Sequence, residues 1–179
     1  MVGAPSAYVE GGYRGHKASP GTYSLTLKYP GNEAKGECKI LPNPLYEITP
    51  ATYAEYDAFM KGMESSLNEM HKKVNTALDV RNQIEGVLKD LPEGDTFTAL
   101  KKDGEALVAR MKAWDEDMVQ RKSKAYDDVE NFPNKFTANF LFLINATESD
   151  IPRVNQPNRD QLKVLMAEWA QLKSRADEL

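Results

Sequence analysis

The residues able to do chemistry are few in this chain, and carboxylates are the most clustered of them. Asp115, Glu116 and Asp117 are consecutive and follow Trp114. A glycosidase needs two carboxylates at a set separation, one of them with a raised pKa. Consecutive residues of a helix point in different directions, because one turn takes about 3.6 residues. We therefore interpret these three carboxylates as a solvated helix face.

A second acidic group, Asp127, Asp128 and Glu130, lies in the polar segment 122–133. Carboxylate oxygens are ligands for hard cations such as calcium. The Asp-x-Asp-x-Asp-Gly spacing of a calcium loop is absent, however. We expect these acids to cap a helix or to pair with the lysines of the same segment.

The chain has two histidines and one cysteine. A zinc site or a catalytic triad needs more partners than His16 and His71 provide, and we interpret both as solvent residues. Cys38, in a weak strand, is expected to pack. No phosphate-binding glycine motif is present. The sequence therefore predicts no catalytic residues, no metal and no cofactor.

The composition restricts the classes of partner. The chain has 27 acidic and 23 basic residues and a net charge of −4. Nucleic-acid binding normally requires a basic surface, so this balance argues against it. The longest apolar run, around 140–144, is far shorter than the roughly 20 residues of a membrane span. No signal peptide follows Met1.

The N-terminal part reads as a tail and a small β element. Residues 1–21 hold five of the eleven glycines and are expected to form a flexible tail. A β-hairpin is predicted over 22–43, because 22–29 alternates in polarity and 35–41 resembles a weaker second strand. One hairpin alone is marginal in water. It must pair with residues 4–10, pack on the helices, or be the edge of a larger sheet.

From residue 49 the spacing of apolar residues changes to steps of three and four, which is typical of helices. Thr49 and Pro50 predict the N-cap and first position of a long helix, and Asn158 is expected to cap the last one. The four predicted helices cover about 50–91, 96–121, 133–147 and 158–178. Short connections favour an up-down-up-down order. The fold class expected is mainly α: an elongated antiparallel four-helix bundle over 49–179, with the small N-terminal hairpin.

The first two predicted helices are joined by a turn, so facing residues should have numbers that sum to a constant. Setting Leu88 against Phe97 places Arg81 opposite Gly104. Glycine inside a helix costs about 1 kcal/mol relative to alanine. We expect Gly104 to make room for the stem of Arg81.

The first helix is about 60 Å long, and the third and fourth reach only about 23 and 32 Å. The end of the first helix pair should therefore protrude as a two-helix arm. Its apolar residues are our candidate contact surface for a protein partner or a second copy of the chain. They are Ile84, Leu88, Leu91, Phe97 and Leu100.

Segment 122–133 is polar for the most part, but it contains Tyr126, Val129 and Phe132, which make it too apolar for a solvated linker. We expect Tyr126 and Phe132 to insert between helix ends and Pro133 to start the third helix.

The order of these features resembles the C-terminal region of large bacterial proteins with sortilin-like or BNR-repeat β-propellers, often labelled glycosyl hydrolases. The likeness rests on the stretch from Pro20 to Leu27, on the exit at Pro42 and Pro44, and on the loop KSKAYDDVENFPNKF. The loop residues most like that family are Tyr126, Asp127, Asp128, Asn131, Phe132 and Pro133.

The resemblance implies that the hairpin is the remnant of an immunoglobulin- or fibronectin-like sandwich. It also implies a propeller and a sandwich domain in the parent chain as partners, and a periplasmic or extracellular location. It assigns no catalytic residue to this region.

Three hypotheses follow from the sequence and the resemblance. The first is a non-catalytic C-terminal helical module for packing, spacing or protein interaction. The second is an accessory module that holds a carbohydrate or peptide, for which Tyr8, Tyr13, Tyr23 and Tyr29 are the candidate aromatic residues. The third is an enzyme with its site in segment 122–133.

Overall fold

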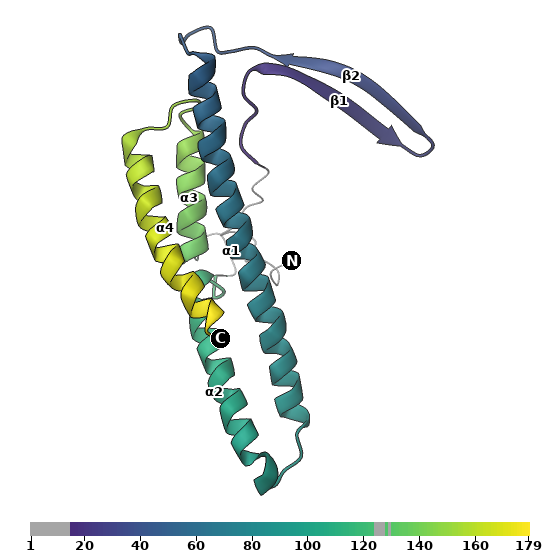
Figure 1. Cartoon of the computed structure of the whole chain (residues 1–179), viewed down its shortest axis with the longest axis vertical. Coiled ribbons are helices and arrows are strands. Elements are labelled where there is room, and N and C mark those ends of the chain that lie inside the picture. The colour runs from purple at the N-terminus through teal and green to yellow at the C-terminus, as the bar shows by residue number, and fades with distance from the viewer. Residues whose placement is uncertain (1–14, 124–127, 129) are drawn as a thin grey trace.

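The computed structural model describes residues 15–123, 128 and 130–179, and these are mainly helical with one antiparallel hairpin (Figure 1). The elements are β1 (Gly21–Tyr29), β2 (Asn32–Ile40), α1 (Pro50–Asp90), α2 (Asp95–Met118), α3 (Phe136–Glu148) and α4 (Gln156–Asp177).

The helix starts follow local capping chemistry. Thr49 caps α1 as predicted, because its side chain accepts a hydrogen bond from Thr52 N. Asn155, not Asn158, caps α4: its Oδ1 accepts from Asn158 N at 2.9 Å. Proline is tolerated in the first helical turn, so Pro157 does not delay α4. The prediction that Pro133 starts the third helix is also wrong, since α3 begins at Phe136.

The direction of the helices differs from the predicted up-down-up-down order. Thr137 Oγ1 donates to Met118 O at 2.9 Å, so α3 starts where α2 ends. Both run antiparallel to α1, and together they cover most of its length (Figure 1). The prediction assumed short connections. The connection from α2 to α3 spans 119–135, which lets the chain continue in the same direction.

Helix α4 runs parallel to α1. Arg159 Nη2 lies 2.6 Å from Glu55 Oε1, and Lys173 Nζ lies 2.5 Å from Glu69 Oε1. Both pairs, like Lys73 with Asp177, join residues 104 positions apart in the sequence. This constant offset defines a parallel register between two helices that are distant in the chain.

The core lies where α1, α3 and α4 meet. The N-terminal half of α1 contributes a seam of apolar residues at the predicted steps of three and four: Tyr56, Met60, Met63, Leu67, Met70 and Val74. Phe136 of α3 stacks on Trp169 of α4 with ring centroids 6.1 Å apart. Trp114 Nε1 donates to Leu172 O, which ties α2 to α4. Most of the buried residues therefore lie near the N-terminal end of α1, which is the end closer to the hairpin.

Beyond the end of α4, the C-terminal half of α1 and the N-terminal half of α2 continue as a two-helix arm (Figure 1). The register within this arm is not the predicted one. A Cβ on Gly104 would lie 2.6 Å from Leu88 Cδ2, so Gly104 faces Leu88 and not Arg81. A seam of threes and fours matches itself after a slip of seven residues, which is the separation of Arg81 and Leu88. Gly104 therefore makes room for a large side chain, but that side chain is Leu88 and not Arg81.

The hairpin projects away from the bundle near the start of α1 (Figure 1). Tyr29 pairs with Asn32 across a turn at Pro30 and Gly31. Gly31 has φ +78°, a conformation that glycine adopts without strain. Almost every hairpin residue is exposed, so the hairpin does not pack on the helices.

Candidate functional site

Cys38 and His71, two of the candidate residues, lie on different elements, β2 and α1. Cys38 is an exposed free thiol on β2, so the expectation that it packs is wrong. His71 is partly buried within α1. Over the described residues, no three His, Cys, Asp or Glu side chains are placed to hold a metal ion.

Asp115 is buried, which corrects the prediction of a solvated acidic face. Its residue is 4 % exposed, and Arg121 binds both carboxylate oxygens, through Nε at 2.5 Å and Nη2 at 2.6 Å. Arg81 Nη1 lies 3.8 Å from the same carboxylate. Glu116 and Asp117 are exposed, and Asp117 pairs with Arg175. Asp115 follows Met111 by one turn and so lies on the seam toward α1.

A pocket of about 320 Å³ lies beside Asp115, between α1, the end of α2 and the connection 119–135. Gln120 is 8 % exposed and holds the connection together. Its Nε2 donates to Pro133 O at 3.0 Å, and its Oε1 accepts from Lys122 N at 2.9 Å. No periodic pattern of residues predicts this pocket, because the pocket depends on an irregular segment.

The segment before the hairpin is anchored to the bundle, so residues 15–20 are not the flexible tail that we predicted. Glu64 Oε1 accepts from His16 N and contacts His16 Nδ1, each at 2.8 Å. Ser19 Oγ donates to Asp57 Oδ1 at 2.6 Å, and His16 Nε2 lies 3.6 Å from the same oxygen. His16 is thus a largely buried contact residue, not a solvent residue. Residues 1–14 lie outside the described residues.

This anchor has the residue types of a hydrolytic triad but not its order. In a triad the serine donates to the histidine, whereas Ser19 donates to Asp57. Beneath it, Tyr56 is fully buried, and burial, helped by Glu148, Asp57 and Glu64, raises its pKa to about 12. The tyrosine therefore stays protonated at neutral pH, and the contacts of His16 and Ser19 hold this segment against α1.

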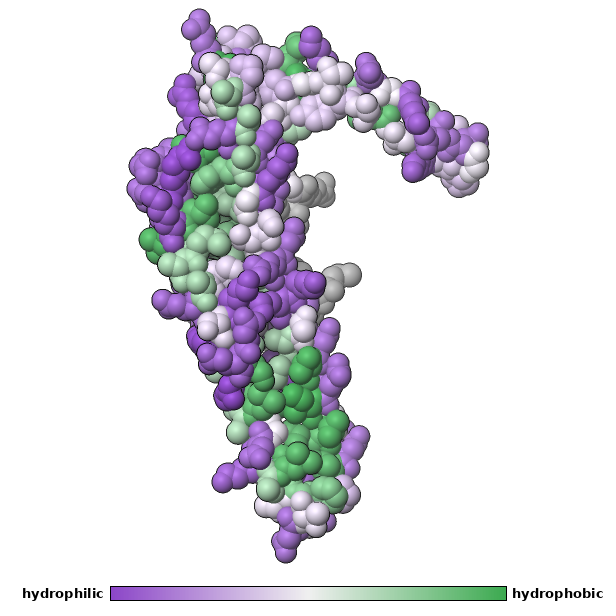
Figure 2. All heavy atoms as spheres, viewed as in Figure 1, coloured by the Kyte–Doolittle hydropathy of each residue, from purple (hydrophilic) through white to green (hydrophobic). Residues whose placement is uncertain are grey.

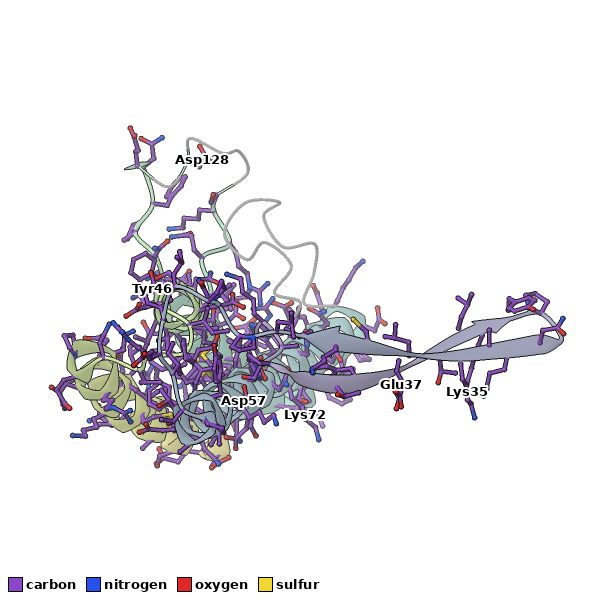
Figure 3. The ribbon with its side chains drawn as sticks, turned by 90° about the horizontal axis from the view of Figure 1, so that it is seen from above. Lys35, Glu37, Tyr46, Asp57, Lys72 and Asp128 are labelled. Carbon is purple, nitrogen blue, oxygen red and sulfur yellow. The ribbon has the colours of Figure 1, made fainter. Side chains whose placement is uncertain are left out.

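The hairpin is amphipathic, and nothing in the described chain covers its apolar face. Tyr23, Leu25, Leu27 and Tyr29 alternate along β1 and are between 37 and 65 % exposed. Opposite residues of an antiparallel pair share a face, so Cys38, Gly36, Ala34 and Asn32 lie on the same side. The charged residues of β2 occupy the other face, from which Lys35 and Glu37 point in a common direction (Figure 3).

The arm exposes a second apolar surface, visible as a continuous hydrophobic area below the C-terminus (Figure 2). Of the predicted contact residues, Leu100 is 53 % exposed, whereas Ile84, Leu88, Leu91 and Phe97 are partly buried. Sequence reasoning missed Val80 and Val87, which are 41 and 61 % exposed. Their spacing of seven residues was the available signal, because it places them on one stripe.

The structure describes only part of the loop that resembles the β-propeller family. Tyr126 and Asp127 lie outside the described residues. The carbonyl of Asp128 accepts from Asn131 N at 3.1 Å and from Phe132 N at 2.9 Å, which forms a tight turn. Phe132 is partly buried and lines the pocket beside the exposed Pro133.

None of the described helices combines the length and the apolar character needed to cross a bilayer. Comparisons with protein-family models, with curated proteins and with solved structures find no match to this chain.

Proposed function

We propose that this chain is a non-catalytic helical module at the C-terminal end of an exported bacterial β-propeller protein, where it serves packing, spacing and protein interaction. The observation that supports it best is the uncovered apolar face of the hairpin.

An isolated two-stranded hairpin is marginally stable, and this one leaves Leu25 and Leu27 more than half exposed. Both of its outer edges are unpaired within the described chain. A second sheet packed about 10 Å away would cover the face of these leucines. The end strands of an immunoglobulin- or fibronectin-like sandwich in the parent chain meet this requirement.

The bundle supplies what a spacer needs. Helix α1 alone spans about 60 Å. The anchor at His16 and Ser19 and the start of α1 at Pro50 hold both ends of the hairpin against this rod. The module therefore presents the hairpin at one end and the apolar arm, with Leu100, at the other.

One observation favours the alternative of an accessory carbohydrate- or peptide-binding module. Tyr23 and Tyr29 are exposed on the same hairpin face. Sugars stack on aromatic rings, but Leu25 and Leu27 between the tyrosines are better suited to a protein surface. If polysaccharide binding is detected and is lost in Tyr23→Ala/Tyr29→Ala, the alternative replaces the first proposal.

The experiment is to identify the native polypeptide that carries this sequence, with antibodies raised against the 20.1 kDa chain. The proposal predicts a product several times larger, found in the periplasm or outside the cell. A product of about the size of the chain itself, retained inside the cell, contradicts it.

A further inference from the structure

We propose that the pocket between α1, the end of α2 and the connection 119–135 binds a phosphate-type dianion, such as the phosphate group of a small ester. This inference is independent of the proposed function, because it rests on the pocket alone.

The residues that line the pocket carry an excess of positive charge. The cations are Arg81, Lys112, Arg121, Lys122 and Lys135, and the acids are Asp115 and Glu116. Lys112 is already paired with Glu85, whose Oε1 lies 2.7 Å from Lys112 Nζ, so five cations and three acids leave +2, in a chain whose net charge is −4. Such a local reversal of sign attracts anions to this place on an acidic protein.

The acids near the pocket do not neutralise Lys122 or Lys135. Asp115 already accepts two hydrogen bonds from Arg121 and lies 3.8 Å from Arg81. Neither Lys122 nor Lys135 has a carboxylate within 4.0 Å in the part of the chain that the structure describes. Several cations around one cavity stabilise a dianion more than a monoanion, because each interaction scales with the charge of the ligand.

The pocket is built before any ligand arrives. The two hydrogen bonds of Gln120 fix the backbone at Lys122 and Pro133, and so hold both sides of the connection. The side chains of Val119 and Phe132 form an apolar part of the pocket wall. The volume of about 320 Å³ exceeds what a phosphate group alone fills. A phosphate joined to a small apolar body therefore suits the site better than free phosphate.

The test is titration calorimetry on the full chain at low ionic strength, in a buffer free of phosphate, with phenyl phosphate, inorganic phosphate and benzoate. The site variant is Lys122→Gln/Lys135→Gln. The control is Lys61→Gln/Lys102→Gln, which removes the same charge from exposed positions away from the pocket. Circular dichroism establishes that both variants are folded.

The proposal predicts that phenyl phosphate binds more tightly than inorganic phosphate, and that benzoate binds most weakly. The site variant should lose at least about tenfold in affinity for phenyl phosphate, while the control keeps the wild-type value. Three results would overturn the proposal: no binding of either phosphate at millimolar concentration, equal losses in the two variants, or benzoate binding as tight as that of phenyl phosphate.

Discussion

At the scale of single residues, Tyr56 is a core side chain whose polar hydroxyl group lies in an unfavourable environment. Its hydroxyl is buried and has no hydrogen-bond partner in the described chain. A buried unpaired hydroxyl carries a desolvation cost of about 1–3 kcal/mol. We expect Tyr56→Phe to leave the free energy of unfolding unchanged or to raise it by about 1 kcal/mol. Urea unfolding at neutral pH measures this, and a loss of stability contradicts it.

The same residue makes stability depend on alkaline pH. The folded-state pKa of Tyr56 is raised from 10.0 to about 12, so the unfolded chain releases the proton at lower pH. Its contribution to stability is therefore complete below pH 10 and is lost as the pH rises toward 12. Tyr56→Phe should lose less stability than the wild type over this range, whereas Tyr29→Phe, at an exposed position, should behave as the wild type.

Asp115 and Asp117 form a matched pair for testing burial. Asp115→Asn removes the buried carboxylate that lies between Arg81 and Arg121, and breaking a buried pair costs about 3–5 kcal/mol. Asp117→Asn removes a half-exposed ion pair with Arg175, which contributes less than about 1 kcal/mol. Chemical denaturation of both variants gives the two values. Equal effects would show that Asp115 is not a structural charge.

The contact between Arg81 and Asp115 could be predicted from the sequence, although the spacing of apolar residues alone does not reveal it. Arg81 is the only charge on the α1 seam, and Asp115 lies on the facing seam of α2. Opposite charges on two facing apolar seams are expected to pair, because an unpaired buried charge is costly. Matching Arg81 with Asp115 gives a sum of 196, which is about one helical turn from the sum of 192 given by the contact of Leu88 with Gly104, and is closer to it than the sum of 185 that we predicted.

At the scale of elements, the arm depends on the contact of Gly104 with Leu88. Gly104→Leu should destabilise the protein by about 1–3 kcal/mol through overpacking, since even a Cβ there meets Leu88. Gly86→Leu makes the same change in α1, where a Cβ meets nothing within 4 Å, and should be stabilising by about 0.5–1 kcal/mol. Thermal unfolding compares the two variants. If both variants are more stable than the wild type, a close approach of α1 and α2 at Gly104 does not stabilise the arm.

The parallel pairing of α1 with α4 should weaken in acid. A hydrogen bond from Lys173 lowers the pKa of Glu69 below 4.5, and one from Lys73 lowers the pKa of Asp177 below 3.8. A lowered folded-state pKa gives stability that is present above the unfolded value and is lost as the pH falls through the folded one. The unfolding free energy should therefore drop from about pH 5 to pH 3, and less so in Glu69→Gln/Asp177→Asn.

These pairs are partly exposed, so the acid effect should be small and should shrink in salt. A pH dependence that is identical in the double variant and in the wild type would show that α4 is held by packing alone.

Element types were predictable, whereas their directions were not. The seam of α1 gave its length and its core residues, because one apolar face over forty residues leaves few alternatives. The course of 119–135 carries no periodic signal, and it decides whether α3 turns back or continues along α1. The parallel α1–α4 register, with Glu69 and Lys173 104 positions apart, follows from that course.

At the scale of the whole molecule, the chain is a rod with an exposed apolar surface at each end. Apolar patterning predicted both the hairpin and the protruding arm. It did not predict the anchor that fixes the hairpin, because His16 and Glu64 are polar and 48 residues apart. Polar contacts across such separations leave no pattern in a single sequence.

If the proposed function is right, the apolar face of the hairpin is covered in the native protein. Hydrogen exchange tests this by comparing β1 and β2 in the chain alone with the same strands in the native polypeptide. We predict fast exchange at the outer edges of the isolated hairpin and at least about tenfold slower exchange in the native protein.

Leu25→Ser/Leu27→Ser should abolish that protection in the native polypeptide, because both residues lie on the apolar face. Thr22→Ser/Thr26→Ser, on the opposite face, should preserve it. If the hairpin of the unaltered native polypeptide exchanges as fast as that of the isolated chain, the face is free and the claim is contradicted.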